Sequence, residues 1–227
     1  GIVTNYRDFH VEEEPYYVPV DDEVDIFMDA FNEKLPVALT GPTGCGKTRL
    51  CEHMAYKIGQ YLNTKYAVDV AFPYVEVLCH EDMTEANLMG RPGLTPGEWI
   101  PGPLYLVAKY GGMLNLDEIV EGRKDILVGI HPATDYRRYL PVAKRGEVIQ
   151  FPDNAMIVAS FNPGYQIKGK DLKQSTRQRF VVIKMGYPSP EKELEIITQE
   201  SGVDQDVATK LVTLANKIRA ARTTTDV

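Results

Sequence analysis

The sequence has few cysteines, one tryptophan and no long hydrophobic run. Its 227 residues include only three cysteines, Cys45, Cys51 and Cys79, and no two of them have Cys-x-x-Cys spacing. Free thiols in a reducing compartment fit this pattern best. There is no apolar run of 18 residues and no signal-peptide pattern. We therefore expect a cytoplasmic protein without membrane insertion.

The chain also lacks an excess of positive charge. It has 25 Lys and Arg residues against 32 Asp and Glu residues, which gives a formal net charge of -7. This balance argues against a constitutive surface for nucleic acid or anionic membranes, although a local basic patch is compatible with it. The hydrophobic fraction of 44% is that of ordinary globular proteins, and the length suits one large domain or one domain plus a fragment.

A phosphate-binding pattern is the strongest positive signal. The stretch 41–48 reads G-x-x-x-x-G-K-T, between an apolar run with strand character and a helical stretch. Glycines let the backbone point its N–H groups inward beside the positive end of the helix. Lys47 adds charge for the phosphates, and the Thr48 hydroxyl can hold Mg²⁺. A chance glycine-rich turn is the alternative. The residues expected to bind nucleotide are Gly41, Pro42, Thr43, Gly44, Cys45, Gly46, Lys47, Thr48 and Arg49.

Two later apolar runs end in polar side chains. The run at 111–116 precedes Asp117 and Glu118, and the run at 155–161 precedes Asn162. An Asp at such a strand end can hold Mg²⁺ and the following Glu can polarise water, and on an extended chain the two point to different sides. Asn162 can orient water or touch the γ-phosphate, or it is a turn residue before a proline. These stretches are weak signals alone and strong ones beside the phosphate loop.

Four further stretches leave two interpretations open. The aromatic segment at 15–19 either packs on an adenine ring or covers the core. His80-Glu81-Asp82 either senses nucleotide or caps a helix, and it has too few ligands for a metal site. The Gly- and Pro-rich stretch at 90–103, which carries Trp99, is expected to form a contact surface, unless the indole tucks back onto the protein. The basic residues at 137–145 either contact a neighbouring subunit or lie on a solvated hairpin.

Apolar periodicity organises the chain as an α/β protein. Residues 60–73 show no regular pattern. Helices are predicted at 21–32, 49–58, 85–88, 104–109, 123–130, 172–180 and 207–221, and a further helix is predicted to begin at 189–191. Strands are predicted at 35–40, 74–79, 111–116, 155–161 and 181–185. We expect a divided chain: an N-terminal extension (1–20), an α/β core (21–187) with inserts at 90–103 and 131–150, and the start of a helical lid (188–227) that is incomplete at the end of the sequence.

The order of these motifs resembles that of the AAA+ ATPases, and the two inserts resemble those of the MoxR branch. The strings PYYVPV, GPTGCGKTRLCEHMA, CHED, LDEIVEGRKD, IHPATDYRR, FNPGYQ and DLKQSTRQRF are very similar to the CbbQ/NirQ/NorQ family. The resemblance covers about residues 14–222. It implies a P-loop core with a five-stranded parallel sheet between helices, ATP and Mg²⁺ as ligands, and ATP hydrolysis coupled to remodelling of another protein.

The resemblance also implies residue roles and partners. Lys47 and Thr48 would belong to Walker A, Asp117 and Glu118 to Walker B, and Asn162 would be sensor 1. Arg179 would be the arginine finger given to the next subunit, with Arg177 as its competitor, while the sensor 2 residue lies beyond this sequence. Family members form hexameric rings, work with a von Willebrand A-domain partner, and reactivate Rubisco or mature nitric oxide reductase. We favour the Rubisco client.

Other classes of function remain possible at this point. A nucleic-acid motor shares the inserts but would need a basic pore, which the acidic balance disfavours. A small-molecule kinase or a GTPase shares the phosphate loop but gives no role to Asn162 and Arg179. A nucleotide-gated adaptor without useful hydrolysis is the third alternative.

Overall fold

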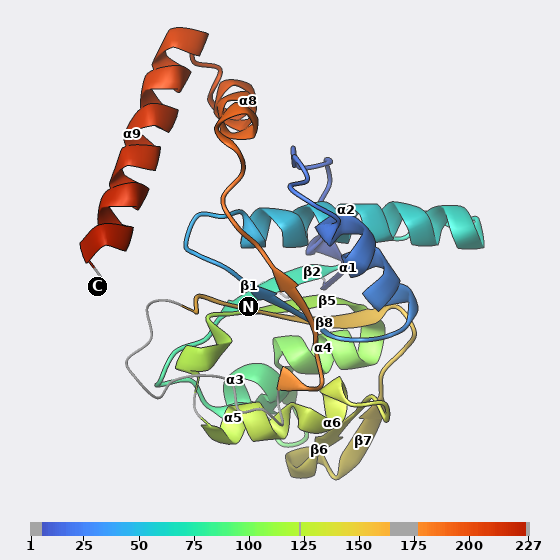
Figure 1. Ribbon diagram of the computed structural model, residues 1–227. Coiled ribbons are helices and arrows are strands. Elements are labelled where there is room, and N and C mark those ends of the chain that lie inside the picture. Colours follow the sequence, from blue (N-terminus) through green and yellow to red (C-terminus); the bar gives the residue numbers. More distant parts are fainter. Residues whose placement is uncertain (1–5, 123, 164–176, 226–227) are drawn as a thin grey trace.

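A five-stranded parallel sheet lies at the centre of the computed structural model, which describes residues 6–122, 124–163 and 177–225 (Figure 1). The strand order is β2-β5-β8-β1-β9, so β8 lies between β5 and β1. All four pairs are parallel. The strands are β1 (Val37–Thr40), β2 (Tyr74–Leu78), β5 (Gly112–Asp117), β8 (Ala155–Phe161) and β9 (Val181–Lys184). The predicted α/β class with this sheet is confirmed.

Helices cover both faces of the sheet (Figure 1). Alternate residues of the central strands contribute to two separate apolar clusters, because successive side chains of a strand point to opposite faces. Val158 belongs to the cluster beneath α1 and α2, and Ile157 belongs to the cluster above α3 and α4. The flanking helices are α1 (Glu23–Asn32), α2 (Lys47–Tyr66), α3 (Glu85–Met89), α4 (Pro103–Tyr110), α5 (Lys124–Gly129) and α6 (His131–Thr134).

Two of these helices differ from the prediction. Helix α2 continues to Tyr66 and ends where Ala67 adopts a left-handed conformation, so residues 60–66 of the stretch predicted to be irregular are helical. Helix α1 begins at Glu23, two residues later than the predicted start at 21, and the side chain of the preceding Asp22 makes no capping bond. Instead, the Glu23 carboxylate accepts hydrogen bonds from the backbone N–H groups of Val20 and Asp21.

Two small hairpins interrupt the core. The first pairs β3 (Gly90–Pro92) with β4 (Trp99–Pro101). Here the structure favours the alternative for Trp99, whose half-buried ring packs 6.0 Å from the ring of Tyr105 and 5.4 Å from the guanidinium of Arg145. The second hairpin lies in the insert predicted at 131–150 and pairs β6 (Tyr139–Val142) with β7 (Glu147–Gln150).

Three short 3-10 turns complete the core, and two helices follow it. The turns are η1 (Tyr6–Asp8), η2 (Ile119–Glu121) and η3 (Ala143–Arg145), and the helices are α8 (Pro190–Ser201) and α9 (Gln205–Thr225). Both helices lie outside the sheet on the side where α2 begins, and α9 runs back from its start near α8 toward the C-terminus (Figure 1). Ser189 caps α8 by accepting a hydrogen bond from the backbone N–H of Lys192. These helices lie where the lid was predicted.

One predicted helix falls largely on residues that the structure does not describe. Most of the helix predicted at 172–180 lies outside the described residues.

All three cysteines are free and buried, and burial raises the pKa of Cys45 and of Cys51 above the usual thiol range. Within the described ranges, no helix combines the length and the apolar character that crossing a membrane requires.

Candidate functional site

The predicted phosphate loop connects the end of β1 to the first residue of α2. Gly44 and Gly46 have φ angles of 77° and 96°, a region that L side chains rarely adopt. At Gly41 a Cβ atom would lie 2.4 Å from the carbonyl oxygen of Met185, so a larger residue would push the loop away from β9. The loop therefore has the tight backbone that an anion cradle at a helix N-terminus requires.

Lys47 is held at the centre of this loop. Its side chain is buried, and its ammonium donates to the carbonyl oxygens of Gly41 (2.9 Å) and Pro42 (3.2 Å). It also donates to the side-chain oxygen of Asn162 at 2.6 Å. Because Asn162 follows the neighbouring strand β8, the sheet brings together two residues that lie far apart in the sequence.

Asn162 also binds Glu118. Its amide nitrogen donates to Glu118 Oε1 and, at 3.1 Å, to the Thr43 hydroxyl. One amide thus bridges Lys47 of the loop and the carboxylate that was predicted to activate water. The structure places the loop, the Asp-Glu pair and the Asn at the same edge of the sheet, where the parallel strands end.

The extended geometry expected for Asp117-Glu118 is wrong. The strand ends at Asp117, and Glu118 has φ 50° and ψ 44°, a left-handed conformation that is uncommon outside glycine. This turn places the Glu118 carboxylate against Asn162. Burial raises the pKa of Glu118, and the neighbouring charge of Asp117 raises it further, while Lys47 opposes both. A raised pKa makes a carboxylate a better proton acceptor.

A buried polar chain behind Asp117 was not found from the sequence. The Ser160 hydroxyl donates to Asp117 Oδ1 at 2.7 Å and lies 3.3 Å from Asn115 Oδ1. The Asn115 amide donates to Glu76 at 3.1 Å, and Ser160 and Asn115 are both fully buried. Polar residues inside otherwise apolar strands were the available signal, because buried polar groups need partners.

The donor set fits a magnesium ion. Asp117 and Thr48 offer carboxylate and hydroxyl oxygens, the hard ligands that Mg²⁺ prefers, and each lies at the edge of the sheet that carries the phosphate loop. Ser160 fixes one oxygen of Asp117. The predicted metal ligands are therefore compatible with their role.

A cavity of about 350 Å³ borders the phosphate loop. It lies between the aromatic segment before α1, the glycines of the loop and one face of α8. This position supports the interpretation in which the segment faces an adenine ring. The lining residues include Tyr16, Tyr17, Val18, Arg49, Ile196 and Ile197.

Helix α8 is tied to both other walls of this cavity. The Tyr16 hydroxyl donates to Glu195 at 2.6 Å, and Arg49 forms an ion pair with Glu200 at 3.0 Å. A second cavity, of about 430 Å³, lies near Tyr61 and Tyr66 at the far end of α2. Only the first of these two cavities touches the phosphate loop.

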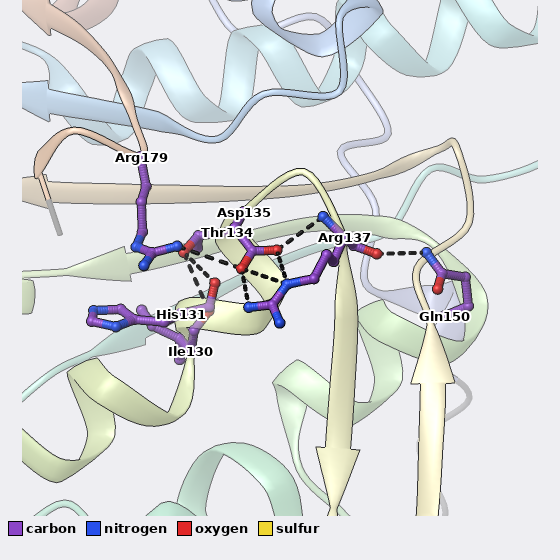
Figure 2. A network of polar contacts seen from close by, with 7 residues as sticks. All are labelled: Ile130, His131, Thr134, Asp135, Arg137, Gln150 and Arg179. Carbon is purple, nitrogen blue, oxygen red and sulfur yellow. Dashed lines mark hydrogen bonds and ion pairs between the residues drawn. The ribbon is translucent and has the colours of Figure 1, made fainter. Parts of the chain in front are cut away.

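The two candidate arginine fingers lie just before β9. The hydrogen-bonded group of Lys47, Asn162 and Glu118 does not include them. Arg179 is partly exposed, and its guanidinium lies 3.5 Å from Asp135 (Figure 2). Arg177 is exposed. In the described part of the chain, the ion pair of Arg179 is made with Asp135 and not with the phosphate loop.

His80, Glu81 and Asp82 are exposed at the end of β2. The capping alternative for them is wrong, because Thr84 precedes α3 and its backbone N–H and hydroxyl both donate to Asn87 at 2.8 Å. The sensing alternative stays a prediction.

Two family models match the chain. The model of the AAA domain of the dynein-related subfamily matches residues 36–180, which contain the sheet and the phosphate loop. The model of the CbbQ/NirQ/NorQ C-terminal region matches residues 193–225, which contain most of α8 and α9.

Several relatives match over most of their length. The protein CbbQ of Hydrogenophilus thermoluteolus is 47% identical over 92% of this chain and 74% of its own. The protein NorQ of Paracoccus denitrificans is 47% identical over 92% of this chain and 73% of its own. The denitrification regulatory protein NirQ of Pseudomonas aeruginosa is 41% identical over 90% of this chain and 75% of its own.

A crystal structure of a Cytophaga hutchinsonii protein, described as a candidate ATPase, has the same fold. It matches 88% of this chain and 60% of that chain, with a TM-score of 0.61 and 15% sequence identity. Since one family model covers more than half of the chain and the three relatives are at least 41% identical to it, the chain belongs to the CbbQ/NirQ/NorQ family of AAA ATPases.

Proposed function

We propose that this protein is the ATP-hydrolysing subunit of a homo-oligomeric ring, a hexamer as in the family it resembles, and that the ring remodels a client enzyme. The observation that carries the proposal is the hydrogen-bonded group in which Asn162 joins Lys47 to Glu118. It places an anion-binding ammonium and a carboxylate base around one amide. Phosphoryl transfer needs this positioning of charge more than it needs covalent chemistry.

Each side chain then has a distinct task. The loop amides and Lys47 bind the phosphates, Glu118 accepts the proton of the attacking water, and Asn162 orients that water. When bound, Mg²⁺ neutralises the charge that develops on the phosphate oxygens. Asp117 and Thr48 would hold it, with Ser160 fixing Asp117. The cavity beside Tyr16 and Tyr17 would take the adenine ring.

The remaining positive charge is proposed to come from another subunit. Arg179, or Arg177 as its competitor, would reach the nucleotide of the neighbour. Arginine fingers of this kind contribute about 10³- to 10⁵-fold in rate. The Arg179 side chain is 30% exposed, which supports this assignment, because a side chain that reaches a neighbouring subunit must lie at the surface.

The client and the partner are proposed from the family. A von Willebrand A-domain protein would connect the ring to its client. Rubisco, relieved of inhibitory sugar phosphates, is the first candidate, and nitric oxide reductase is the second. The equal identity of 47% to CbbQ and to NorQ supports either client. A cytoplasmic location stays a prediction.

A nucleic-acid motor is the weaker alternative. Besides the acidic net charge of -7, the arginines of the second hairpin are engaged within the chain. Arg137 pairs with Asp135, Arg145 pairs with Glu147 at 2.9 Å, and Arg138 donates to two backbone carbonyls. Because these three arginines have partners within the chain, they are less available to bind phosphates than the sequence indicated.

The test uses Glu118→Gln, which removes the base and keeps the shape of the side chain. We expect ATP binding to persist while turnover falls by about 10² to 10⁴. Glu33→Gln, on an exposed residue after α1, is the matched control and should hydrolyse ATP normally.

The same preparations then identify the client. Wild-type protein is mixed with the von Willebrand A partner and either inhibited Rubisco or immature nitric oxide reductase, and client activity is followed with ATP. Recovery of one client, absent with Glu118→Gln, supports the proposal and selects that client. Normal turnover by Glu118→Gln would refute the role of Glu118, and recovery of neither client would refute the remodelling function.

A further inference from the structure

Asp135 lies at a junction between the second hairpin and the candidate finger. It follows α6 and precedes β6, and its side chain is only 10% exposed. Its carboxylate faces two guanidinium groups, those of Arg137 and Arg179 (Figure 2). One acidic side chain therefore contacts arginines from two parts of the chain that are separated by β6, β7 and β8.

The contact with Arg137 is the tighter of the two. Asp135 Oδ1 accepts from the backbone N–H of Arg137 at 2.9 Å and from Nε at 3.2 Å. Oδ2 accepts from Nε at 3.0 Å and from Nη2 at 2.5 Å. The Arg137 guanidinium also holds the pKa of the Asp135 carboxyl below its usual range, so the carboxylate is charged at neutral pH.

Arg137 is itself anchored to the hairpin. Its carbonyl oxygen accepts a hydrogen bond from the side chain of Gln150, the last residue of β7, at 2.9 Å (Figure 2). The same Gln150 nitrogen donates to the carbonyl of Arg138 at 3.0 Å, and the Arg138 guanidinium donates to the carbonyl of Ala155 at the start of β8. The position of Asp135 thus follows the base of the β6–β7 hairpin.

The contact with Arg179 is looser. Nη1 of Arg179 lies 3.5 Å from Oδ2, which is ion-pair distance but beyond a strong hydrogen bond. Two guanidinium groups share one carboxylate, so the local charge remains positive. Among the described residues, Arg179 Nε is buried without a hydrogen-bond partner. Arg179 is therefore oriented without being neutralised, as a residue that must later meet an anion requires.

We propose that Asp135 is a positioning residue that orients Arg179 and makes its placement depend on the β6–β7 hairpin. This inference rests on the proposed function, because it takes Arg179 as the residue offered to a neighbouring nucleotide. It gives the hairpin a way to influence hydrolysis: a movement of its base shifts Asp135 and, with it, the guanidinium. A displacement of 1 Å in a catalytic group can cost about 100-fold in rate.

The experiment compares single and double variants of the full chain. Asp135→Asn removes the charge and keeps the shape. Asp153→Asn makes the same change at a side chain that is 78% exposed and pairs with Lys34, so it serves as the matched control. ATP affinity, kcat and melting temperature are measured for both, and for Arg179→Ala with and without Asp135→Asn.

If Asp135 acts through Arg179, Asp135→Asn lowers kcat by roughly tenfold to 100-fold with little change in ATP affinity. It then lowers kcat no further when Arg179 is already alanine. Arg137→Gln, which frees Asp135 from the hairpin, should lower kcat less than Asp135→Asn. A melting temperature equal to that of Asp153→Asn separates this effect from misfolding.

Several outcomes would overturn the inference. An increase in kcat would mean that Asp135 restrains Arg179, and an additive loss in the double variant would mean that Asp135 acts elsewhere. An unchanged rate for Arg137→Gln would remove the link to the hairpin. If Arg179→Ala lowers kcat and Asp135→Asn does not, only this inference fails; if Arg179→Ala has no effect, the proposed finger fails first.

Discussion

At the scale of single residues, the side chains of the candidate site are held in place by hydrogen bonds to one another. Asn162 holds Glu118 and Lys47 together, and Ser160 holds Asp117 from the neighbouring strand. Hydrogen bonds to charged groups are among the strongest in proteins, particularly where water is excluded. These hydrogen bonds therefore fix the positions of the charged groups.

Ser160→Ala tests this support for the metal site. Loss of the hydroxyl leaves a partly buried carboxylate oxygen short of a donor, at a cost of about 1–3 kcal/mol at most. Asp117 then becomes less well oriented for Mg²⁺. We expect the Mg²⁺ concentration at half-maximal ATPase rate to rise, with kcat largely recovered at saturating Mg²⁺.

Ser160→Thr is the matched variant, because it keeps the hydroxyl at the same position of β8. Titration of the ATPase rate with Mg²⁺ should give nearly wild-type behaviour for Thr and a shifted curve for Ala. Identical Mg²⁺ curves for both variants, with only a lower melting temperature for Ala, would show that Ser160 stabilises the strand and has no part in metal binding.

At the scale of elements, the cavity beside the loop is closed by α8 through a few polar contacts. Tyr16→Phe removes the hydrogen bond to Glu195 while keeping the ring that lines the cavity. Helix α8 should then close less firmly, and we expect ATP affinity to fall several-fold with little change in kcat. Binding of a fluorescent ATP analogue measures this effect.

Tyr61→Phe is the control, since its hydroxyl accepts a hydrogen bond from Lys65 at the far end of α2, away from the loop. Equal ATP affinities for Tyr16→Phe, Tyr61→Phe and the wild type would show that the contact between Tyr16 and Glu195 does not hold the cavity closed.

The same scale shows what the sequence could and could not predict. Strand β8 was predicted with its observed bounds, because seven successive apolar or small residues leave few alternatives for a strand buried on both faces. The phosphate loop was predicted from glycines at fixed spacing. Both predictions depend on neighbouring residues in the sequence, so tertiary contacts do not change them.

Tertiary contacts account for the errors. The left-handed turn at Glu118 is stabilised by Asn162, which follows the distant strand β8, so the sequence wrongly predicted an extended chain. The tilt of Trp99 toward Tyr105 depends on a helix that follows it. Ser160 could not be paired with Asp117 before the order of the strands was known.

At the scale of the whole molecule, the residues proposed to bind nucleotide and the arginine proposed as the finger lie in different parts of the chain. The loop, Asn162 and Glu118 form one group at the end of the sheet, whereas Arg179 belongs to the group around Asp135 (Figure 2). A single chain thus carries the proposed nucleotide site and, in a separate group, the arginine that is proposed as the finger. Rings of AAA ATPases are suited to such a division, and we propose it here as the central feature.

Mixing two inactive variants tests this central claim most directly. Lys47→Ala loses its own nucleotide site but retains Arg179, and Arg179→Ala retains its site but offers no finger. Each variant alone should lose about 10³-fold or more in ATPase rate. In a mixture, an interface that combines the intact site of one with the finger of the other should regain activity, in proportion to the number of such interfaces. A mixture no more active than the two separate variants would contradict the account.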